Sequence, residues 1–344
     1  MKELQTNATR DMETEIVEAI SMFQPRPTIA IIGHESPDGD CVGACAAMEL
    51  YIRNLIEMSA PEVKDVAIID VLINPVYRNV EKTLPGVCGR THQHNGNYDI
   101  AIALDVNAGR MGEKGNKAFE NAKIKLMIDH HATNSGAGAD KYWIRPGFSS
   151  CCELLYWLIA KNTQIDFPSI CARELYVGIL TDTGSFRFDS VTPDTFAAAG
   201  NLIACGIDFP EINRQLFSEK EYTSMKMTAY AVLNSELKAN KKVIVSVISY
   251  ETLQNFGATL DDIGRVPNEL LSCEDAIVSI TFTEYAPGEY TGSFRSKSKD
   301  VAVSACAIAL GGGGHRAAAG CKFTTNDIEE VVKMSIAILS QMTK

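Results

Sequence analysis

Hydrophobic positions in the first half of the chain form short, almost continuous runs separated by helical patterns. The runs cover residues 28–34, 66–73, 98–105 and 124–131 and are rich in β-branched side chains, whereas residues 40–58 place apolar side chains at helical spacing. Strands that are apolar on both faces are typical of a parallel sheet with helices on each side. The pattern therefore predicts an α/β domain with a mainly parallel sheet flanked by helices.

The remaining pattern predicts further helices and a second domain. Residues 12–23 form an amphipathic pattern that Pro25 and Pro27 end, and after residue 146 the pattern is mostly helical. The later runs predict strands over 241–250, 274–285 and 289–296, then helices over 301–310 and 327–342. We predict three segments with a cleft between the two domains: an N-terminal α/β domain over 1–215, a helical linker over 216–235 and a smaller α/β domain with a mixed sheet over 236–344.

Composition and charge narrow the class of protein. The 344 residues are 46% hydrophobic and 22% charged, which is ordinary for a soluble globular protein. No apolar stretch is long enough to span a bilayer and the N-terminus lacks a signal-peptide pattern, so we expect a cytoplasmic protein without a membrane partner. The net charge of −11 argues against a nucleic-acid-coating protein, but it allows local binding of an anion. The ten cysteines show no CxxC pair, so we expect free thiols.

Acidic and imidazole side chains follow the predicted strands, at the point where each strand ends. His34, Asp38 and Asp40 follow the first strand, Asp105 ends another, and the DHH triplet at 129–131 ends the next. In an open parallel sheet, ligands bind beyond the carboxyl ends of the strands. We therefore expect these side chains to meet in one crevice, with Asp182 after a helix as a further contributor.

A close group of carboxylates repels itself unless cations neutralise it, so these residues predict a divalent metal site. Carboxylate and imidazole ligands without thiolate suit Mn²⁺ and, less well, Mg²⁺, Co²⁺ or Fe²⁺. The ligands suffice for two ions if one carboxylate bridges them, and two ions are the usual device for displacement at phosphorus. Consecutive residues of an extended segment point in opposite directions, so we expect only one of His130 and His131 to be a ligand.

Structural explanations compete with some of these assignments. Asp105 also suits the cap of a following segment, and the stretch around Asp182 also reads as an ordinary turn. His92 and His94 resemble a metal pair, but the asparagines and glycine beside them predict a surface loop.

Five pieces of sequence in this order resemble the DHH phosphoesterase family with its DHHA1 domain: HESPDGD, a strand-end Asp, DHH, TDTGSFRF and GGGGH. The resemblance covers nearly the whole chain and points to the branch of the family that degrades very short RNA and 3′-phosphoadenosine 5′-phosphate. The resemblance implies one metal site at His34 and Asp38, a second at Asp40, His130 and Asp182, a bridging Asp105, a catalytic His131 facing the phosphate, and a catalytic Asp129 orienting the histidines.

The glycine run GGGGH predicts a substrate site in the second domain. Glycines let the backbone approach a ligand closely and expose N–H groups to a phosphate. Two features depart from the family pattern, Ala44 where a serine is frequent and LDVNAGRMG in place of a threonine-glycine-rich motif, and both bear on substrate preference. The predicted substrate-binding residues are Arg110, Arg295, Ser296, Gly312, Gly313, Gly314, His315 and Arg316.

The leading hypothesis is a Mn²⁺-dependent phosphoesterase that hydrolyses short oligoribonucleotides to mononucleotides and 3′-phosphoadenosine 5′-phosphate to AMP. Its partner would be a short single-stranded RNA or small nucleotide, and a homodimer is left open. Alternatives within the family are a phosphodiesterase for the linear dinucleotide pApA and a pyrophosphatase or exopolyphosphatase. A single-strand nucleic-acid-binding module without catalysis is the non-enzyme alternative, but 8% aromatic content offers no obvious stacking surface.

Overall fold

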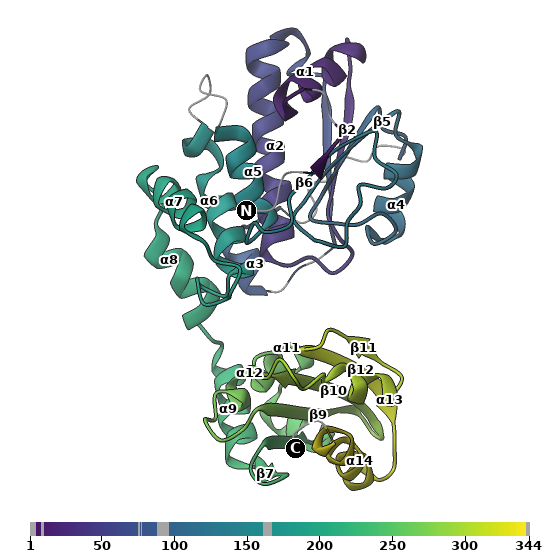
Figure 1. Cartoon of the computed structure of the whole chain (residues 1–344), viewed down its shortest axis with the longest axis vertical. Helices are drawn as coiled ribbons and strands as arrows, with labels where there is room; N and C mark the ends of the chain where they lie inside the picture. The colour runs from purple at the N-terminus through teal and green to yellow at the C-terminus, as the bar shows by residue number, and fades with distance from the viewer. Residues whose placement is uncertain are drawn as a thin grey trace. The chain divides into compact units, whose positions relative to one another are not determined.

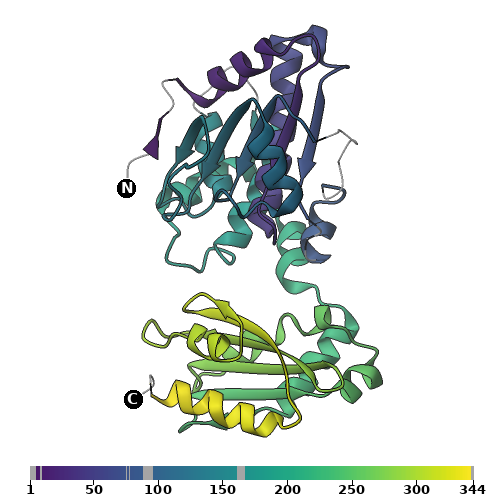
Figure 2. The ribbon, with the colours of Figure 1, turned by 90° about the vertical axis from the view of Figure 1, so that its right-hand side faces the viewer.

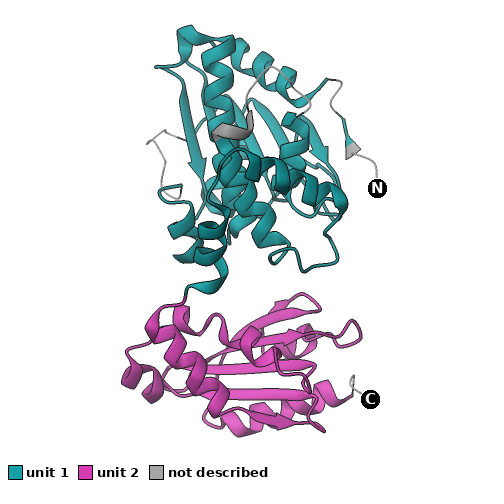
Figure 3. Ribbon diagram, turned by 90° about the vertical axis from the view of Figure 1, so that its left-hand side faces the viewer, with its two compact units in different colours: residues 1–219 teal, residues 220–344 magenta. Residues whose placement is uncertain are grey.

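A computed structural model describes residues 5–7, 10–74, 76, 78–87, 96–160 and 167–341. His92 and His94 lie outside these residues. The chain divides into two compact units, Met1–Glu219 and Lys220–Lys344, which Figure 3 draws in different colours. Within the described ranges, no helix has both the length and the apolar character needed to cross a bilayer.

The first unit is built on a sheet whose strands run parallel except at one edge. The strand order is β1-β6-β5-β4-β2-β3, and only β1 pairs antiparallel with its neighbour. The bounds are β1 (Gln5–Thr6), β2 (Thr28–Ile32), β3 (Ile68–Leu72), β4 (Ile100–Leu104), β5 (Ile124–Asp129) and β6 (Lys141–Ile144).

Successive residues of a central strand point to opposite faces of the sheet and pack into two different apolar cores. Ile29 and Ile31 of β2 belong to the large core beneath α1, α2 and α5, whereas Ala30 and Ile32 belong to the smaller core beneath α4. Figures 1 and 2 show α2 and α4 on opposite faces of this sheet. All four residues are fully buried, which explains why the strand reads as a continuous apolar run. The helices named here are α1 (Met12–Met22), α2 (Gly39–Ser59), α4 (Gly112–Asn121) and α5 (Cys151–Ala160).

Helix α6 packs closely on α2 at Gly43 and on α5 at Gly178. A Cβ on Gly43 would lie 2.4 Å from the carbonyl oxygen of Glu174, and a Cβ on Gly178 would lie 2.2 Å from Sγ of Cys152. Close backbone approach therefore explains glycine at both positions. The remaining helices of the unit are η1 (Pro61–Val63), α3 (Arg78–Thr83), α6 (Phe167–Asp182), α7 (Pro193–Ala204), α8 (Phe209–Asn213) and η2 (Arg214–Ser218).

The second unit has a mixed sheet with helices on both faces. Its strand order is β11-β12-β10-β9-β8-β7, in which only β8 and β9 are parallel. One core lies beneath α13 and α14, and the other lies beneath α9 to α12. The bounds are β7 (Glu236–Lys238), β8 (Val243–Ile248), β9 (Val278–Ala286), β10 (Glu289–Ser296), β11 (Gly313–Gly314), β12 (Ala318–Thr324), α9 (Tyr222–Leu233), α10 (Tyr250–Phe256), α11 (Leu260–Ile263), α12 (Val266–Leu271), α13 (Ser304–Ala309) and α14 (Ile328–Ser340).

The predicted fold class is confirmed, with differences in detail. The four apolar runs of the first half each contain a strand, and the pattern missed β6, β12 and the very short strands β1, β7 and β11. Helix α9 lies within the predicted linker and buries Met227 and Ala231 in the core of the second unit. The nine cysteines in the described segments carry free thiols.

Candidate metal centre

The predicted ligands occupy the carboxyl ends of three neighbouring strands and the ends of two helices. His34 follows β2, Asp105 follows β4, and His130 follows β5. Asp40 lies in the first turn of α2, and Asp182 is the last residue of α6. Because β5, β4 and β2 are adjacent and parallel, their carboxyl ends deliver these side chains to one edge of the sheet.

His34 and Asp38 form one side of the centre. Asp38 is the N-cap of α2, and its Oδ1 accepts from the backbone N–H groups of Asp40 and Cys41 at 3.1 Å. His34 Nε2 lies 3.8 Å from Asp38 Oδ1 and 3.7 Å from Asp105 Oδ2. Burial lowers the pKa of His34, but the interactions with Asp38 and Cys41 together outweigh it and raise the pKa to about 10. The distances of 3.7 and 3.8 Å from His34 Nε2 to the two carboxylate oxygens are longer than those of a direct hydrogen bond.

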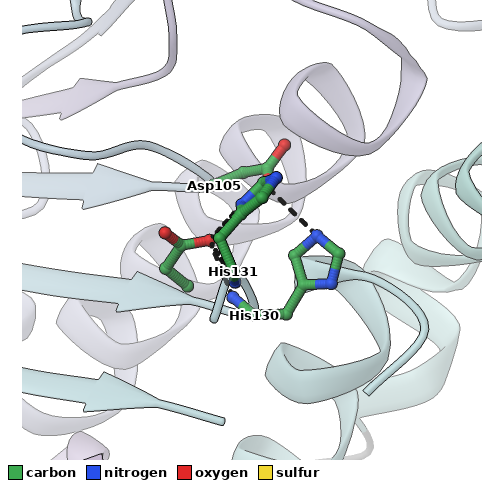
Figure 4. Close-up of side chains that lie close together, drawn as sticks. Asp105, His130 and His131 are labelled. Atoms are coloured by element: carbon green, nitrogen blue, oxygen red, sulfur yellow. Dashed lines mark hydrogen bonds and ion pairs between the residues drawn. The ribbon is translucent and has the colours of Figure 1, made fainter. Parts of the chain in front are cut away.

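Asp105 lies at the middle of the centre in an unusual backbone conformation. Its φ of 56° is in the left-handed region, which residues other than glycine rarely adopt. The side chain is buried, and Oδ1 accepts no hydrogen bond, although Nε2 of His130 and Nδ1 of His131 each lie 3.5 Å from it. Figure 4 shows both histidines turned toward this carboxylate. Burial raises the pKa of Asp105 well above its usual range, and the carboxylate of Asp40 adds to this effect.

The expectation that His130 and His131 point in opposite directions is wrong. Their ring centroids lie 4.5 Å apart, and both rings reach the same oxygen of Asp105. Strand alternation does not apply, because β5 ends at Asp129 and the two histidines lie in the loop that follows. They differ in exposure instead, with 14% of the His130 side chain exposed and 50% of His131.

Backbone and carboxylate acceptors fix the tautomer of each histidine. Nδ1 of His130 lies 3.2 Å from the carbonyl oxygen of Phe148, and a carbonyl can only accept, so Nδ1 carries a proton. In the neutral imidazole, which is the form that binds a metal, Nε2 then presents its lone pair. Nδ1 of His131 lies 2.8 Å from Oδ1 of the fully buried Asp129. The same Asp129 oxygen accepts from the backbone N–H groups of both histidines, at 2.7 and 3.1 Å. Asp129 therefore holds the DHH segment in place.

Asp40, His130 and Asp182 form the other side of the centre. Nε2 of His130 lies 3.5 Å from Asp182 Oδ2 and 3.9 Å from Asp40 Oδ2. Burial raises the pKa of Asp182 to about 7, and the carboxylate of Asp40 contributes. Burial lowers the pKa of His130, but the neighbouring carboxylates of Asp105, Asp40 and Asp182 together outweigh it and raise the pKa to about 10.

These residues fit a divalent cation on three observations of the structure. The ligand atoms of Asp40, His130 and Asp182 lie within 4.8 Å of one another. Oδ1 of Asp105 is buried without a hydrogen-bond donor, which is costly unless a cation satisfies it. The perturbed pKa values of three carboxyl groups have burial and mutual repulsion as their causes, and a cation relieves the repulsion. Which ions bind, and how many, stays a prediction.

The predicted substrate-binding residues fall in both units. Arg110 is exposed in the loop after β4, and its backbone oxygen accepts from the N–H of Glu35. Arg295 and Ser296 end β10, where Nη1 of Arg295 donates to the carbonyl oxygen of Phe294. Oγ of Ser296 donates to the carbonyl oxygen of Ser298 and accepts from the N–H of the same residue.

The glycine run offers fewer N–H groups to a ligand than the sequence suggests. Gly312 N–H donates to the carbonyl oxygen of Ala307, and His315 N–H donates to that of Ala318. Gly313 and Gly314 form β11 and pair with β12. The exposed Arg316 donates through Nε to the carbonyl oxygen of Lys299. The substrate role of this run stays a prediction, and it rests on the N–H groups not used in these contacts.

Sequence reasoning missed groups that support the centre through the backbone. The carbonyl of Phe148 contacts His130, and the N–H groups of Cys151 and Cys152 donate to Asp40 at 2.6 and 2.9 Å. Backbone groups leave no signature in residue identity. One signal was present, because Ser150 and Glu153 precede an apolar run at the spacing of a helix capping box.

Two family models match this chain. The model described as "DHH family, N-terminal domain" matches residues 28–179, and the model described as "DHHA1 domain" matches residues 240–341. Together they span more than half of the chain, and the protein belongs to the DHH phosphoesterase family with a DHHA1 domain. The family defines the class of protein as a hydrolase of the phosphoesterase type.

Relatives and a solved structure match over most of their length. The "Bifunctional oligoribonuclease and PAP phosphatase NrnA" of Bacillus subtilis is 25% identical over 92% of this chain and 95% of its own. The protein of the same name from Mycoplasma genitalium is 26% identical with the same coverage. The crystal structure of an exopolyphosphatase-related protein from Bacteroides fragilis covers 98% of this chain and 100% of its own, with 21% identity and a TM-score of 0.80, which shows the shared fold.

Proposed function

We propose that this protein hydrolyses short oligoribonucleotides to mononucleotides and 3′-phosphoadenosine 5′-phosphate to AMP. The observation that carries the proposal is the convergence of Asp40, Asp182 and His130 around Asp105, whose buried oxygen has no hydrogen-bond donor. The relatives from Bacillus subtilis and Mycoplasma genitalium are named as oligoribonucleases and PAP phosphatases, which supports this substrate class.

The described side chains divide into two ligand groups that meet at Asp105. His34 and Asp38 would hold one ion, and Asp40, His130 and Asp182 would hold the other, with Asp105 shared. Carboxylate and imidazole donors favour Mn²⁺, with Mg²⁺ or Co²⁺ as alternatives. When bound, two such ions supply charge stabilisation for the attacking and leaving oxygens at phosphorus.

His131 has the position and charge to bind the reacting phosphate. Half of its side chain is exposed, and Nδ1 is bound to Asp129, which leaves Nε2 as the nitrogen directed to other partners. Hydrogen bonding to Asp129 raises the pKa of His131, which shifts the equilibrium toward the imidazolium form. Nε2–H of that form donates a charge-assisted hydrogen bond to a phosphate oxygen.

An assay panel with purified protein and Mn²⁺ tests the proposal. The substrates are dinucleotides, a longer single strand, 3′-phosphoadenosine 5′-phosphate, pApA and pyrophosphate. We expect mononucleotides from the short oligonucleotides, loss of activity in Asp105→Asn and full activity in Asp140→Asn, an exposed aspartate outside the centre. Hydrolysis of pyrophosphate alone, or full activity after exhaustive chelation, would overturn the proposal. The homodimer and the cytoplasmic location stay predictions.

A further inference from the structure

The first turn of α5 and the loop before it contact the candidate centre mainly through backbone groups, and Sγ of Cys152 also donates to the backbone oxygen of Asp40 at 3.5 Å. The carbonyl oxygen of Phe148 lies 3.2 Å from Nδ1 of His130 and selects the tautomer that presents Nε2. The N–H groups of Cys151 and Cys152 donate to the two oxygens of Asp40 at 2.6 and 2.9 Å. A small shift of this loop would therefore move two residues of the same predicted ligand group together.

Glu153 fixes that loop from inside the protein. Its side chain is 1% exposed, and Oε2 accepts from the backbone N–H of Ser149 at 2.9 Å and from Oγ of Ser149 at 2.6 Å. Its own N–H donates to Oγ of Ser150 at 2.9 Å. Ser149 directly follows Phe148, and Ser150 and Glu153 flank Cys151 and Cys152, so these contacts restrain the groups that reach His130 and Asp40.

The same carboxylate also reaches the segment that follows Asp182. Oγ1 of Thr195 donates to Oε2 of Glu153 at 3.0 Å, and Thr195 belongs to the capping box that begins α7. Asp182 ends α6, and residues 183–192 connect it to α7. Glu153 thus links the segment that supports His130 and Asp40 to the start of α7, the helix that follows Asp182 in the chain.

The other ligand group has its own support. Asp38 accepts from N–H groups at the start of α2, and the backbone N–H of His34 donates to Sγ of Cys41 at 3.3 Å. Among the residues that the structure describes, no hydrogen bond joins His34, Asp38 or Cys41 to the Phe148–Glu153 segment, and the N–H of Asp40 is the one link between the two groups. Substitution of Glu153 should therefore disturb the Asp40, His130 and Asp182 group more than the His34 and Asp38 group.

We propose that Glu153 is a positioning residue that sets the metal affinity of the Asp40, His130 and Asp182 group. This inference rests on the proposed two-metal function. Glu153 touches neither substrate nor ion; it acts through the loop that orients His130 and Asp40.

Calorimetric titration of the metal-free full chain with Mn²⁺ tests the inference. The variants are Glu153→Gln, which keeps one carbonyl oxygen as an acceptor, and Ser149→Ala, which removes one donor. Glu49→Gln is the matched control, because Glu49 is also buried but pairs with Arg53 on the far part of α2. Thermal unfolding in EDTA reports the stability of each variant separately from metal binding.

We expect the wild type and Glu49→Gln to bind two ions. Glu153→Gln should bind one ion with unchanged affinity and the other at least about tenfold more weakly, with Ser149→Ala intermediate, and kcat should fall more than KM rises. A variant with a lower melting temperature and wild-type affinity for both ions would show a merely structural role and overturn the inference. If Glu153→Gln does not fold, the Ser149→Ala titration decides in the same way. A wild type that binds no Mn²⁺ would instead refute the proposed function.

Discussion

An asparagine in place of Asp129 must turn its amide nitrogen toward at least one hydrogen-bond donor. The buried carboxylate accepts from the backbone N–H groups of His130 and His131. It also accepts from Nδ1 of His131 at 2.8 Å and from Nδ2 of Asn134 at 2.5 Å. Asn134 cannot rotate to offer its oxygen, because that oxygen accepts from the N–H of Gly136 at 2.9 Å. Asp129→Asn therefore brings two amide nitrogens together in a buried site.

The size of the effect follows from these contacts. A hydrogen bond to a charged acceptor contributes about 1.5–3 kcal/mol, and one to a neutral acceptor contributes about 0.5–1.5 kcal/mol. Asp129→Asn loses the bond to Asn134 and weakens the remaining three, so we expect the free energy of unfolding to fall by roughly 3 kcal/mol. For a domain of this size the melting temperature should fall by about 6–12 °C.

The loss of unfolding free energy in Asp129→Asn should depend on pH, because Asp129 forms an ion pair with His131. The pKa shifts of these two groups determine the direction of the dependence. Burial would raise the pKa of Asp129, but the hydrogen bonds and charge of His131, together with the hydrogen bond from Asn134, outweigh burial and lower the pKa. The stabilisation by Asp129 is therefore present above about pH 3.9 and is lost as pH falls through the folded pKa. The pKa of His131 is raised by hydrogen bonding to Asp129, so its stabilisation is complete below about pH 6.5 and is lost as pH rises through the folded pKa. The difference between wild type and variant should be largest between these limits.

Equilibrium urea unfolding in EDTA at pH 5.5 and pH 9 measures both effects. Asp140→Asn is the control, because Asp140 is exposed and accepts from the backbone N–H of Lys125 at 2.8 Å. An Asp129→Asn variant no less stable than this control, or one whose loss grows with pH, would refute the reasoning.

Three further predictions concern the centre, the helix interface and the glycine run. Asp105→Asn should abolish calorimetric Mn²⁺ binding and keep the wild-type far-UV circular dichroism spectrum, and binding at wild-type affinity would contradict the shared-ligand assignment. Gly178→Ala should lower the free energy of unfolding by about 1–3 kcal/mol in urea, because its Cβ would lie 2.2 Å from Sγ of Cys152, and an unchanged value would contradict the packing argument. Gly312→Ala should lower the melting temperature, because its Cβ would lie 2.2 Å from a backbone oxygen, whereas Gly313→Ala meets nothing within 4 Å and should leave it unchanged.

The strands were predictable where both faces are buried. The strand β2 reads as a continuous apolar run because helices cover both sides of the sheet. The strand β6 is short and begins with Lys141, and β12 contains Gly320 and alternates buried with exposed residues, so neither gives a strong run. Strands with weak patterns such as these are defined by their neighbours in the sheet and not by their own sequence.

The residues of the centre were predictable because topology alone brings strand ends together. The directions of the side chains were not, since they depend on backbone angles that no pattern reveals. Asp105 adopts a left-handed φ, and the loop after β5 turns His130 and His131 toward the same oxygen. The supporting carbonyl of Phe148 is a backbone group that any residue would supply.

A bound cation explains why the carboxylate of Asp105 is buried. Fold stability would favour an apolar side chain or a paired acid at this position, because a buried carboxylate oxygen without a donor is costly. The left-handed φ adds strain, and the carboxylate of Asp40 adds repulsion. These costs fall on one residue, which lies within 3.7 Å of His34 on one side and 3.5 Å of His130 on the other. A cation offsets the desolvation and the repulsion together, whereas a proton removes the charge and leaves the geometry of the two histidines unexplained.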